Sequence, residues 1–190
     1  MPRLIAGQAK GKKLKVLGKE VRPTSDKIRQ ALFNTLEHRF YIQFDNLNVL
    51  DLYAGTGALG LEALSRGATK GIWVESEKRA LQTLKQNIKL VNQGLRFQSQ
   101  VIAMPVEKFI KRPVSQAFDL IFVDPPYHLK QGPIVLDNLH SSMIHSDTLV
   151  IIEHDKRDLF DPPSSWSQVF IRKYSDTMIS IYQKSDENHL

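Results

Sequence analysis

A buried strand that runs into a glycine-rich turn constrains this chain more than any other feature. Residues 47–53 read as a β-strand, and Gly55-Thr-Gly-Ala-Leu-Gly60 follows it at the start of a predicted helix. Glycines in such a turn let the backbone approach a ligand closely. Glu75 ends the next predicted strand, where a carboxylate can accept hydrogen bonds from a ribose diol. The pattern therefore favours an adenosine-containing cofactor at the carboxyl ends of parallel strands.

Strands and helices alternate along the rest of the chain. Further strands are predicted at 71–75, 97–103, 118–124 and 148–153, and an antiparallel hairpin at 169–174 and 178–182. Helices are predicted at 59–65, 77–91 and 134–143, with a short one ending near position 111. Five strand–helix units closed by a hairpin predict an α/β fold with a three-layer, mostly parallel sheet.

Two cofactors fit the glycine-rich turn, NAD and S-adenosylmethionine. Asp51, at the end of the strand, would repel the pyrophosphate of NAD at close range. The same carboxylate suits the ammonium group of a methionine moiety, so it favours S-adenosylmethionine. A simpler interpretation also remains, in which Asp51 caps the backbone of the turn.

A second motif, Asp124-Pro125-Pro126-Tyr127, ends the predicted strand 118–124. The two prolines fix the backbone, so the Asp124 carboxylate and the Pro125 carbonyl are held rigidly as acceptors. An exocyclic amino group of a base needs two such acceptors, and Tyr127 offers a face on which the base can stack. The motif indicates catalysis by orientation of an amino nitrogen; the alternative is a strand-ending turn with an exposed tyrosine.

Positive charge is concentrated at the N-terminus. Residues 1–30 hold nine basic and two acidic residues, whereas the other 160 hold 17 and 18. This asymmetry favours a polyanion partner over a solvated tail. Two short strands, 3–7 and 13–17, are predicted to pair as a hairpin, and a helix is predicted to begin after Pro23.

Composition excludes several classes of protein and predicts a compartment. The chain has no cysteine, which excludes a disulfide scaffold and a thiol nucleophile. Its six histidines show no metal-ligand spacing, so no metal is expected. The N-terminus does not read as a secretory signal, and no apolar run approaches the roughly 18 residues of a membrane span. We therefore expect a cytoplasmic protein with no membrane partner.

The two motifs carry a resemblance to a known family. Asp51-Leu-Tyr-Ala-Gly-Thr-Gly-Ala-Leu-Gly-Leu-Glu-Ala-Leu-Ser-Arg-Gly67 and Asp124-Pro-Pro-Tyr127 resemble class I S-adenosylmethionine-dependent methyltransferases. The stretches Ile5-Ala-Gly7, Lys10-Gly-Lys-Lys-Leu14 and Arg22-Pro-Thr-Ser-Asp26 narrow the likeness to bacterial 16S ribosomal RNA guanine-N2 methyltransferases. The resemblance implies a Rossmann-like, seven-stranded sheet and methylation of a guanine N2 in 16S rRNA, in an assembling 30S subunit.

The resemblance also implies roles for individual residues. The methionine end of S-adenosylmethionine would lie against Asp51, Ala54, Gly55, Thr56 and Gly57. The ribose would bind Glu75, the adenine would lie between Ala103 and Met104, and Arg22, Pro23 and Thr24 would close over the cofactor. Asp124, Pro125, Pro126 and Tyr127 would hold the guanine, and the candidate RNA clamp is Arg3, Lys10, Lys12, Lys13, Lys15, Arg22, Lys27 and Arg29. The sequence departs from the methyltransferase pattern at the adenine. Many methyltransferases carry an acid or amide side chain there for the adenine amino group, whereas residues 102–105 offer none.

The hypothesis that follows divides the chain into a basic extension, 1–40, and a methyltransferase domain, 41–190. It expects a monomer that releases S-adenosylhomocysteine. Three alternatives are weighed against it: a DNA adenine-N6 methyltransferase, which shares the Asp-Pro-Pro-Tyr motif; an NAD-dependent oxidoreductase; and a non-catalytic RNA-binding assembly factor. Residues 127–148 leave no room for a domain that reads duplex DNA, and Asp51 argues against NAD.

Overall fold

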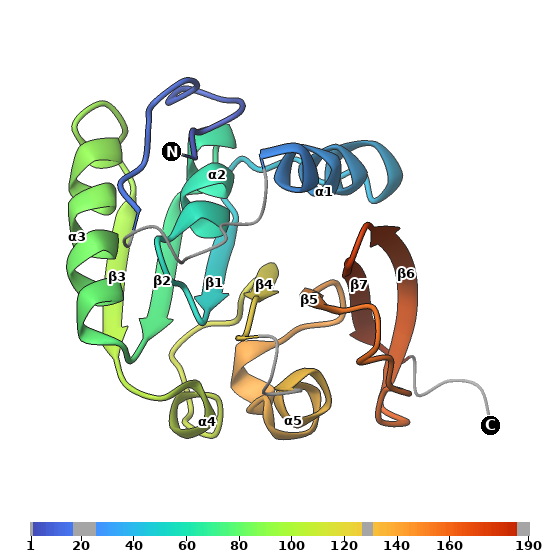
Figure 1. Ribbon diagram of the computed structural model, residues 1–190. Helices are drawn as coiled ribbons and strands as arrows, with labels where there is room; N and C mark the ends of the chain where they lie inside the picture. The colour runs from blue at the N-terminus through green and yellow to red at the C-terminus, as the bar shows by residue number, and fades with distance from the viewer. Residues whose placement is uncertain (1, 17–25, 127–130, 186–190) are drawn as a thin grey trace.

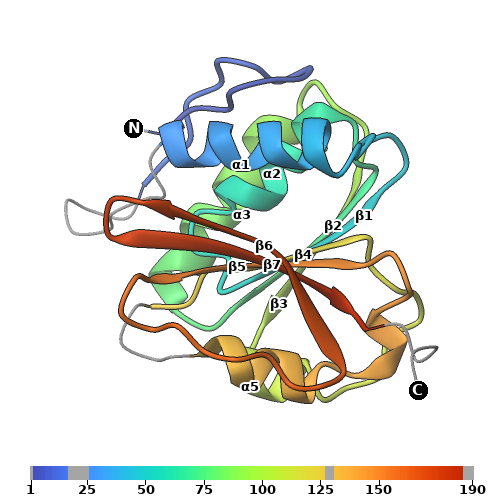
Figure 2. The same ribbon diagram turned by 90° about the vertical axis from the view of Figure 1, so that its right-hand side faces the viewer.

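The computed structural model describes residues 2–16, 26–126 and 131–185, and it confirms the predicted three-layer architecture (Figures 1 and 2). One seven-stranded sheet has the order β3-β2-β1-β4-β5-β7-β6. The strands are β1 (Asn48–Leu52), β2 (Lys70–Glu75), β3 (Gln98–Ala103), β4 (Leu120–Val123), β5 (Leu149–Asp155), β6 (Trp166–Tyr174) and β7 (Thr177–Lys184). The first five are parallel, and β7 runs antiparallel to both β5 and β6.

Helices cover both faces of the sheet. They are α1 (Asp26–Arg39), α2 (Ala58–Arg66), α3 (Lys78–Asn92), α4 (Val106–Phe109) and α5 (Gln131–Asn138), with a 3-10 turn at Ser141–Met143. In Figure 2, α1 and α2 lie above the sheet and α5 lies below it, and buried residues of α3 belong to the same core cluster as those of α1 and α2. Alternate residues of a strand point to opposite faces, so Val49 packs under α1 to α3 while Leu50 packs under α4 and α5.

Some element boundaries differ from the predicted ones. The predicted helix 134–143 is two elements, because α5 ends at Asn138 and the chain turns again at His140. The His140 ring accepts a hydrogen bond from Ser142 N at 3.1 Å and so begins the 3-10 turn. The C-terminal strands are longer than predicted, and they meet at the predicted turn at positions 175–176.

The two N-terminal segments, 3–7 and 13–16 as far as the structure describes them, meet in antiparallel orientation in residues 2–16, here called the N-terminal arm. An isolated antiparallel bridge joins Arg3 to Lys13, and backbone hydrogen bonds from Leu4 N to Lys12 O at 3.0 Å and from Leu14 N to Pro2 O at 2.8 Å join the same two segments. The predicted pairing is therefore present but short, and other amides of the arm bond to α2. Both oxygens of the buried Glu62 accept hydrogen bonds, from Ile5 N at 2.8 Å and Ala6 N at 3.0 Å. The pairing of the two segments does not extend to Ile5 and Ala6, because their amides bond to α2.

The N-terminal arm lies at the edge of the sheet opposite the carboxyl ends of the parallel strands. Its anchors are in the last turns of helices, at Ser65 in α2 and at Leu90 and Val91 in α3. In a β–α–β unit the end of the helix lies beside the start of the next strand. Figure 1 shows this arrangement, with the arm above the helices and the arrowheads of β1 and β2 below.

Candidate active site

The turn between β1 and α2 uses left-handed backbone at Tyr53 (φ 57°), Gly55 (φ 53°) and Gly57 (φ 78°). Glycine adopts this conformation freely, whereas tyrosine loses about 1 kcal/mol. The Tyr53 hydroxyl donates a hydrogen bond to Glu107 Oε1 at 2.9 Å, which ties the turn to α4. Burial and this carboxylate raise the pKa of Tyr53 above its ordinary value.

The glycines of the turn serve different purposes. A Cβ on Gly57 would lie 2.5 Å from Leu84 Cδ1, and one on Gly60 would lie 2.6 Å from Trp73 Nε1. These two glycines therefore allow α2 to pack closely against its neighbours. A Cβ on Gly55 would meet no atom nearer than 3.9 Å. The space beside Gly55 is open, as a cofactor cradle requires.

Glu75 holds the turn in place from the end of β2. Its Oε2 accepts a hydrogen bond from Gly55 N at 2.9 Å, and its Oε1 accepts bonds from Ser76 N and Glu77 N at 2.7 and 2.8 Å. A carboxylate offers about four acceptor positions, so these bonds leave about one for a ligand hydroxyl. The strand register sets Ala103 beside Glu75, with Met104 next along the chain. The residues predicted to bind ribose and adenine thus lie at one edge.

Asp51 is buried under the turn, with 2% of its surface exposed. Its Oδ2 accepts a hydrogen bond from Gly60 N at 2.9 Å. Burial raises the pKa of Asp51 to about 7; the Gly60 amide opposes this shift and the nearby charge of Glu75 adds to it. The bond to Gly60 matches the turn-capping interpretation of this aspartate.

Asn87 of α3 is a site residue that the sequence analysis missed. Its side chain is fully buried and bonds to two other segments. Asn87 Oδ1 accepts from Lys15 N at 2.8 Å, and its Nδ2 donates to Lys15 O at 3.1 Å and Thr56 O at 2.9 Å. The glycine-rich turn and the N-terminal arm are therefore joined through one amide. A signal was present, because Asn87 is a polar residue within the apolar face of α3.

The Asp124-Pro125-Pro126 motif begins directly after β4, next to the glycine-rich turn. Leu52 and Val123 are paired in the parallel register, and Asp124 N lies 3.5 Å from Leu52 O. Both motifs therefore leave the same edge of the sheet from adjacent strands. A cavity of about 100 Å³ lies beside the motif and is lined by Pro125, Pro126, Glu153, His154 and Phe160, among others. Tyr127 lies outside the described residues, as do Arg22, Pro23 and Thr24.

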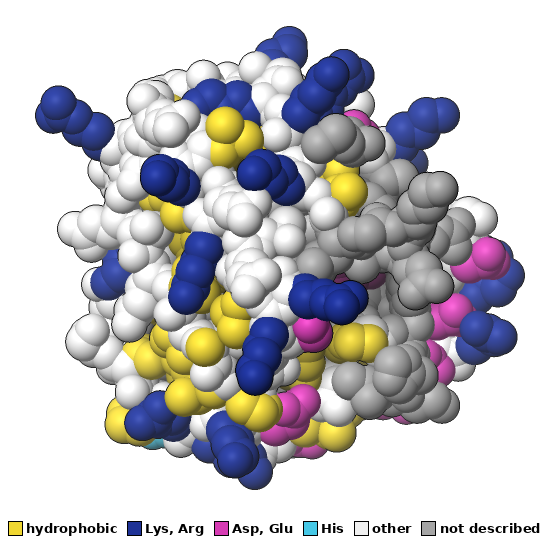
Figure 3. Space-filling model, turned by 60° about the vertical axis from the view of Figure 1, so that its left-hand side comes forward, with side chains coloured by type: hydrophobic (Ala, Val, Ile, Leu, Met, Phe, Trp, Pro, Cys, Tyr) yellow, Lys and Arg dark blue, Asp and Glu magenta, His cyan; other side chains and the backbone are white. Residues whose placement is uncertain are grey.

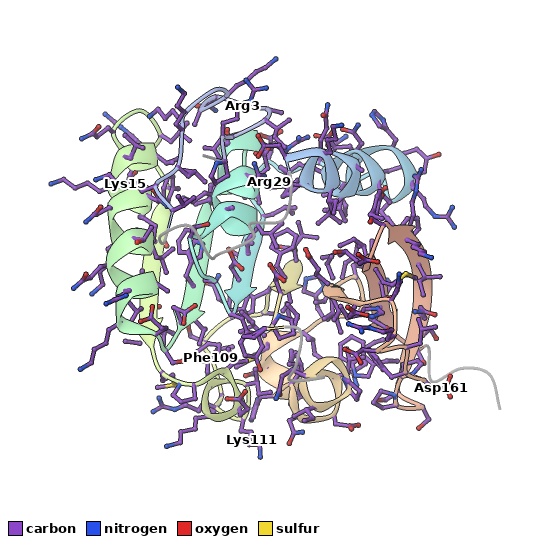
Figure 4. All side chains as sticks on the ribbon, viewed as in Figure 1. Arg3, Lys15, Arg29, Phe109, Lys111 and Asp161 are labelled. Carbon is purple, nitrogen blue, oxygen red and sulfur yellow. The ribbon has the colours of Figure 1, made fainter. Side chains whose placement is uncertain are left out.

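The structure corrects one member of the predicted RNA clamp. Arg29, labelled in Figure 4, is fully buried between α1 and the N-terminal arm. Its Nη2 donates to Arg3 O at 2.6 Å and Asp26 Oδ1 at 2.8 Å, and its Nε lies 3.8 Å from Glu62. A guanidinium enclosed by protein acceptors is not available to phosphates, so Arg29 is a structural cation.

The other predicted clamp residues that the structure describes are not fully buried. These residues are Arg3, Lys10, Lys12, Lys13, Lys15 and Lys27. Lys12 is half-buried, and its ammonium donates to Leu90 O at 3.1 Å and Val91 O at 3.4 Å. It therefore caps the C-terminus of α3, where a cation is favourable. Lys15 donates to Gln86 Oε1 at 2.9 Å while remaining exposed.

The described residues contain no candidate metal site and no candidate membrane span. No group of three or more histidine, aspartate or glutamate side chains within ranges 2–16, 26–126 and 131–185 could hold a metal ion. No helix in these ranges is long and apolar enough to cross a membrane.

A solved structure shares this fold. An Escherichia coli protein provisionally described as a methyltransferase superposes with a TM-score of 0.81 at 28% identity, covering 98% of this chain and 99% of that one. The fold, with its glycine-rich turn and its Asp-Pro-Pro motif, defines the class of Rossmann-like methyltransferases.

The chain belongs to the family described as Conserved hypothetical protein 95, whose family model matches residues 2–183. A Bacillus subtilis protein provisionally named an rRNA methyltransferase is 36% identical over 188 residues, covering 96% of this chain and 98% of that one. Ribosomal RNA small subunit methyltransferase D of Haemophilus influenzae is 35% identical over 168 residues, covering 87% of this chain and 84% of that one. The predicted family resemblance is thereby confirmed.

Substitution of Gly55 by alanine should weaken cofactor binding without unfolding the protein. The methyl group would enter the open space beside the turn, and the left-handed φ would cost about 1 kcal/mol of stability. We expect Gly55→Ala to bind S-adenosylhomocysteine at least ~10-fold more weakly by calorimetry. Gly11→Ala is the matched control, because Gly11 has φ 84° and nothing within 4 Å of its Cβ position. Equal affinities in the two variants would contradict the assignment of the cradle.

The buried Asp51 should make stability depend on pH. Its folded pKa of about 7 exceeds the ordinary value of 3.8, so between these values the folded protein holds a proton that the unfolded chain releases. Stability should therefore fall as pH rises from about 4 to 7. Between pH 5 and pH 8 the wild type should lose about 2 kcal/mol more unfolding free energy than Asp51→Asn, measured in urea. Parallel losses in both proteins would show that Asp51 is ionised throughout.

Proposed function

We propose that this protein transfers a methyl group from S-adenosylmethionine to the exocyclic N2 of a guanine in 16S rRNA, on an assembling 30S subunit. One observation carries the proposal. Two motifs meet at one edge of the sheet: a cofactor-type glycine turn after β1 and an Asp-Pro-Pro motif after the adjacent β4. The names of the Bacillus and Haemophilus relatives support an rRNA substrate.

The residues around the turn fit S-adenosylmethionine, which when bound supplies an electrophilic methyl group. Gly55 offers open space, and Ala54, Thr56 and Gly57 complete the turn against which the methionine end would lie. Asp51 is buried beneath this turn, and its carboxylate, when ionised, would attract an ammonium group from below. Glu75 has about one acceptor position for a ribose hydroxyl, and Ala103 and Met104 would flank the adenine. Arg22, Pro23 and Thr24 would close over the cofactor.

Asp124 and Pro125 would act on the guanine amino group. The carboxylate and the carbonyl are acceptors held by two prolines, so together they can accept both hydrogens of N2. This arrangement directs the nitrogen lone pair away from the protein, toward the methyl group that it gains. As the N–C bond forms and the carbon–sulfur bond breaks, the nitrogen becomes acidic; Asp124 would accept the proton that it loses, and S-adenosylhomocysteine would be the leaving group. Pro126 keeps the motif rigid, and Tyr127 would stack on the base.

The strand next to this motif supports guanine over adenine. Val123 pairs with Ile152 at the end of the β4–β5 ladder, and Asp124 and Glu153 are the next residues of the two segments. Glu153 also lines the cavity that Pro125 and Pro126 line, so it lies beside the motif. Beside its amino group, guanine carries the N1–H donor, to which a carboxylate can bond. Adenine has an unprotonated N1 at this position, which a carboxylate would repel.

The reaction itself is tested by transfer of label from tritiated S-adenosylmethionine. Protein-free 16S rRNA, duplex DNA and 30S subunits from cells that lack this activity would serve as substrates. We expect label in N2-methylguanosine from RNA, and its loss in Asp124→Ala, which should still bind S-adenosylhomocysteine within about twofold of the wild type. Label in N6-methyladenine would identify a DNA adenine methyltransferase. An absence of label with intact cofactor binding would indicate an RNA-binding assembly factor.

Recognition of N1–H by Glu153 is tested with 2-aminopurine at the target position, since this base keeps the amino group but lacks N1–H. The wild type should prefer guanine by about 100-fold in kcat/KM. Glu153→Gln should reduce this preference about tenfold, because an amide can donate to or accept from N1. If Glu153 only supports the fold, both substrates should lose activity by the same factor.

A further inference from the structure

Two segments of this protein carry basic side chains and no acidic ones. Positions 78–103, which include α3 and β3, hold five basic residues, and the N-terminal arm holds five more. These segments are far apart in the sequence but adjacent in the structure. Lys12 bonds to the last turn of α3, and Lys15 bonds to Asn87 in the middle of the same helix. Together they form one surface without carboxylates of its own.

Three lysines follow the outward face of α3. Lys78, Lys85 and Lys89 are separated by seven and four residues, so they lie within about 40° of each other around the helix. All three are exposed, whereas Leu84 and Val91 on the opposite face are buried. Figure 3 turns this side of the molecule forward: Lys and Arg side chains are spread over it, and acidic ones gather toward its lower and right-hand parts.

A groove of about 480 Å³ runs between α3 and β3, which is an edge strand of the sheet. Lys85 and Lys89 line it together with the polar side chains of Asn92, Gln93 and Ser99, over an apolar floor of Ile88 and Val101. Ammonium groups bind phosphates, and amides and hydroxyls bond to phosphate and ribose oxygens without reading the base sequence. The groove therefore has the chemistry of a nucleic-acid backbone site.

The position of α3 connects the two ends of the molecule. The helix begins beside Glu75 at the active-site edge and ends beside the N-terminal arm, about 22 Å away at 1.5 Å per residue. That span equals about six stacked nucleotide steps of 3.4 Å. Most of the arm lies at the edge of the sheet opposite the active site, and only its end at Lys15 is joined to the glycine-rich turn, through Asn87. The ammonium group of Lys12 in the arm is bonded within the protein.

We infer that the outward face of α3 and the α3–β3 groove form a track for the RNA backbone, which joins the N-terminal arm to the active-site edge. This inference rests on the proposed rRNA substrate. The track supplies sequence-independent affinity through phosphate contacts, and the active site selects the base.

Charge reversal on the track tests this inference. The double variant Lys85→Glu/Lys89→Glu should raise KM for the RNA substrate about 10- to 100-fold at moderate salt, with kcat and S-adenosylhomocysteine affinity within about twofold of the wild type. The salt dependence of RNA binding should weaken by about 0.7 in slope for each lost contact to a single strand. The matched control is Arg172→Glu/Lys173→Glu, at exposed positions of β6 at the other edge of the sheet.

Filter binding of protein-free 16S rRNA keeps this test independent of methyl transfer. If no RNA is methylated, the proposed function fails, yet selective loss of rRNA binding in Lys85→Glu/Lys89→Glu would still support the track. The inference is wrong if both double variants bind rRNA equally well. It is also wrong if the α3 variant is impaired only on the 30S particle, because the surface would then contact a ribosomal protein.

Discussion

The parallel pairing of β1 with two neighbours is the constraint on which the rest of this site depends. β1 is hydrogen-bonded to β2 on one side and β4 on the other, in registers that end level with one another. The glycine-rich turn, Glu75 and Asp124 therefore emerge at one edge, although they span more than seventy residues of chain. Backbone hydrogen bonds of the sheet bring these groups to one edge. Side-chain bonds, such as that from Gly55 N to Glu75 Oε2, then fix the local geometry.

Buried polar side chains make that local geometry rigid. Glu62 and Asn87 each bond to backbone groups of the N-terminal arm, and Asn87 also bonds to the glycine-rich turn. A buried amide or carboxylate without partners would cost about 1–3 kcal/mol, so these residues are stabilising only in this one arrangement. Glu62 and Asn87 therefore both determine the position of the arm and stabilise it there. Asp51 acts similarly beneath the turn, where burial raises its pKa.

Much of the fold could be predicted from the sequence because its signals are local. Apolar runs and the glycine turn predicted the strands, their mostly parallel arrangement and the edge at which the site lies. The contacts of the N-terminal arm could not be predicted, because Glu62 and Ser65 lie nearly sixty residues from the amides they bind. Arg29 was predicted to be a free cation because its acceptor Arg3 O is also distant in the sequence. Counting charges along the sequence located the excess of positive charge at the N-terminus. It missed the basic face of α3, because acidic residues elsewhere in the chain balance the lysines of this helix in the count.

The docking of the N-terminal arm has a consequence for how this protein can change. A Cβ on Gly7 would lie only 1.7 Å from Ser65 O, and Leu4 and Leu14 of the arm belong to the same core as β1 and α2. The arm is therefore part of the hydrophobic core and cannot be treated as a detachable module. A different RNA-contacting surface could not be acquired by exchanging the arm as a unit. It would have to arise by substitution of exposed side chains on a backbone that the catalytic fold itself requires.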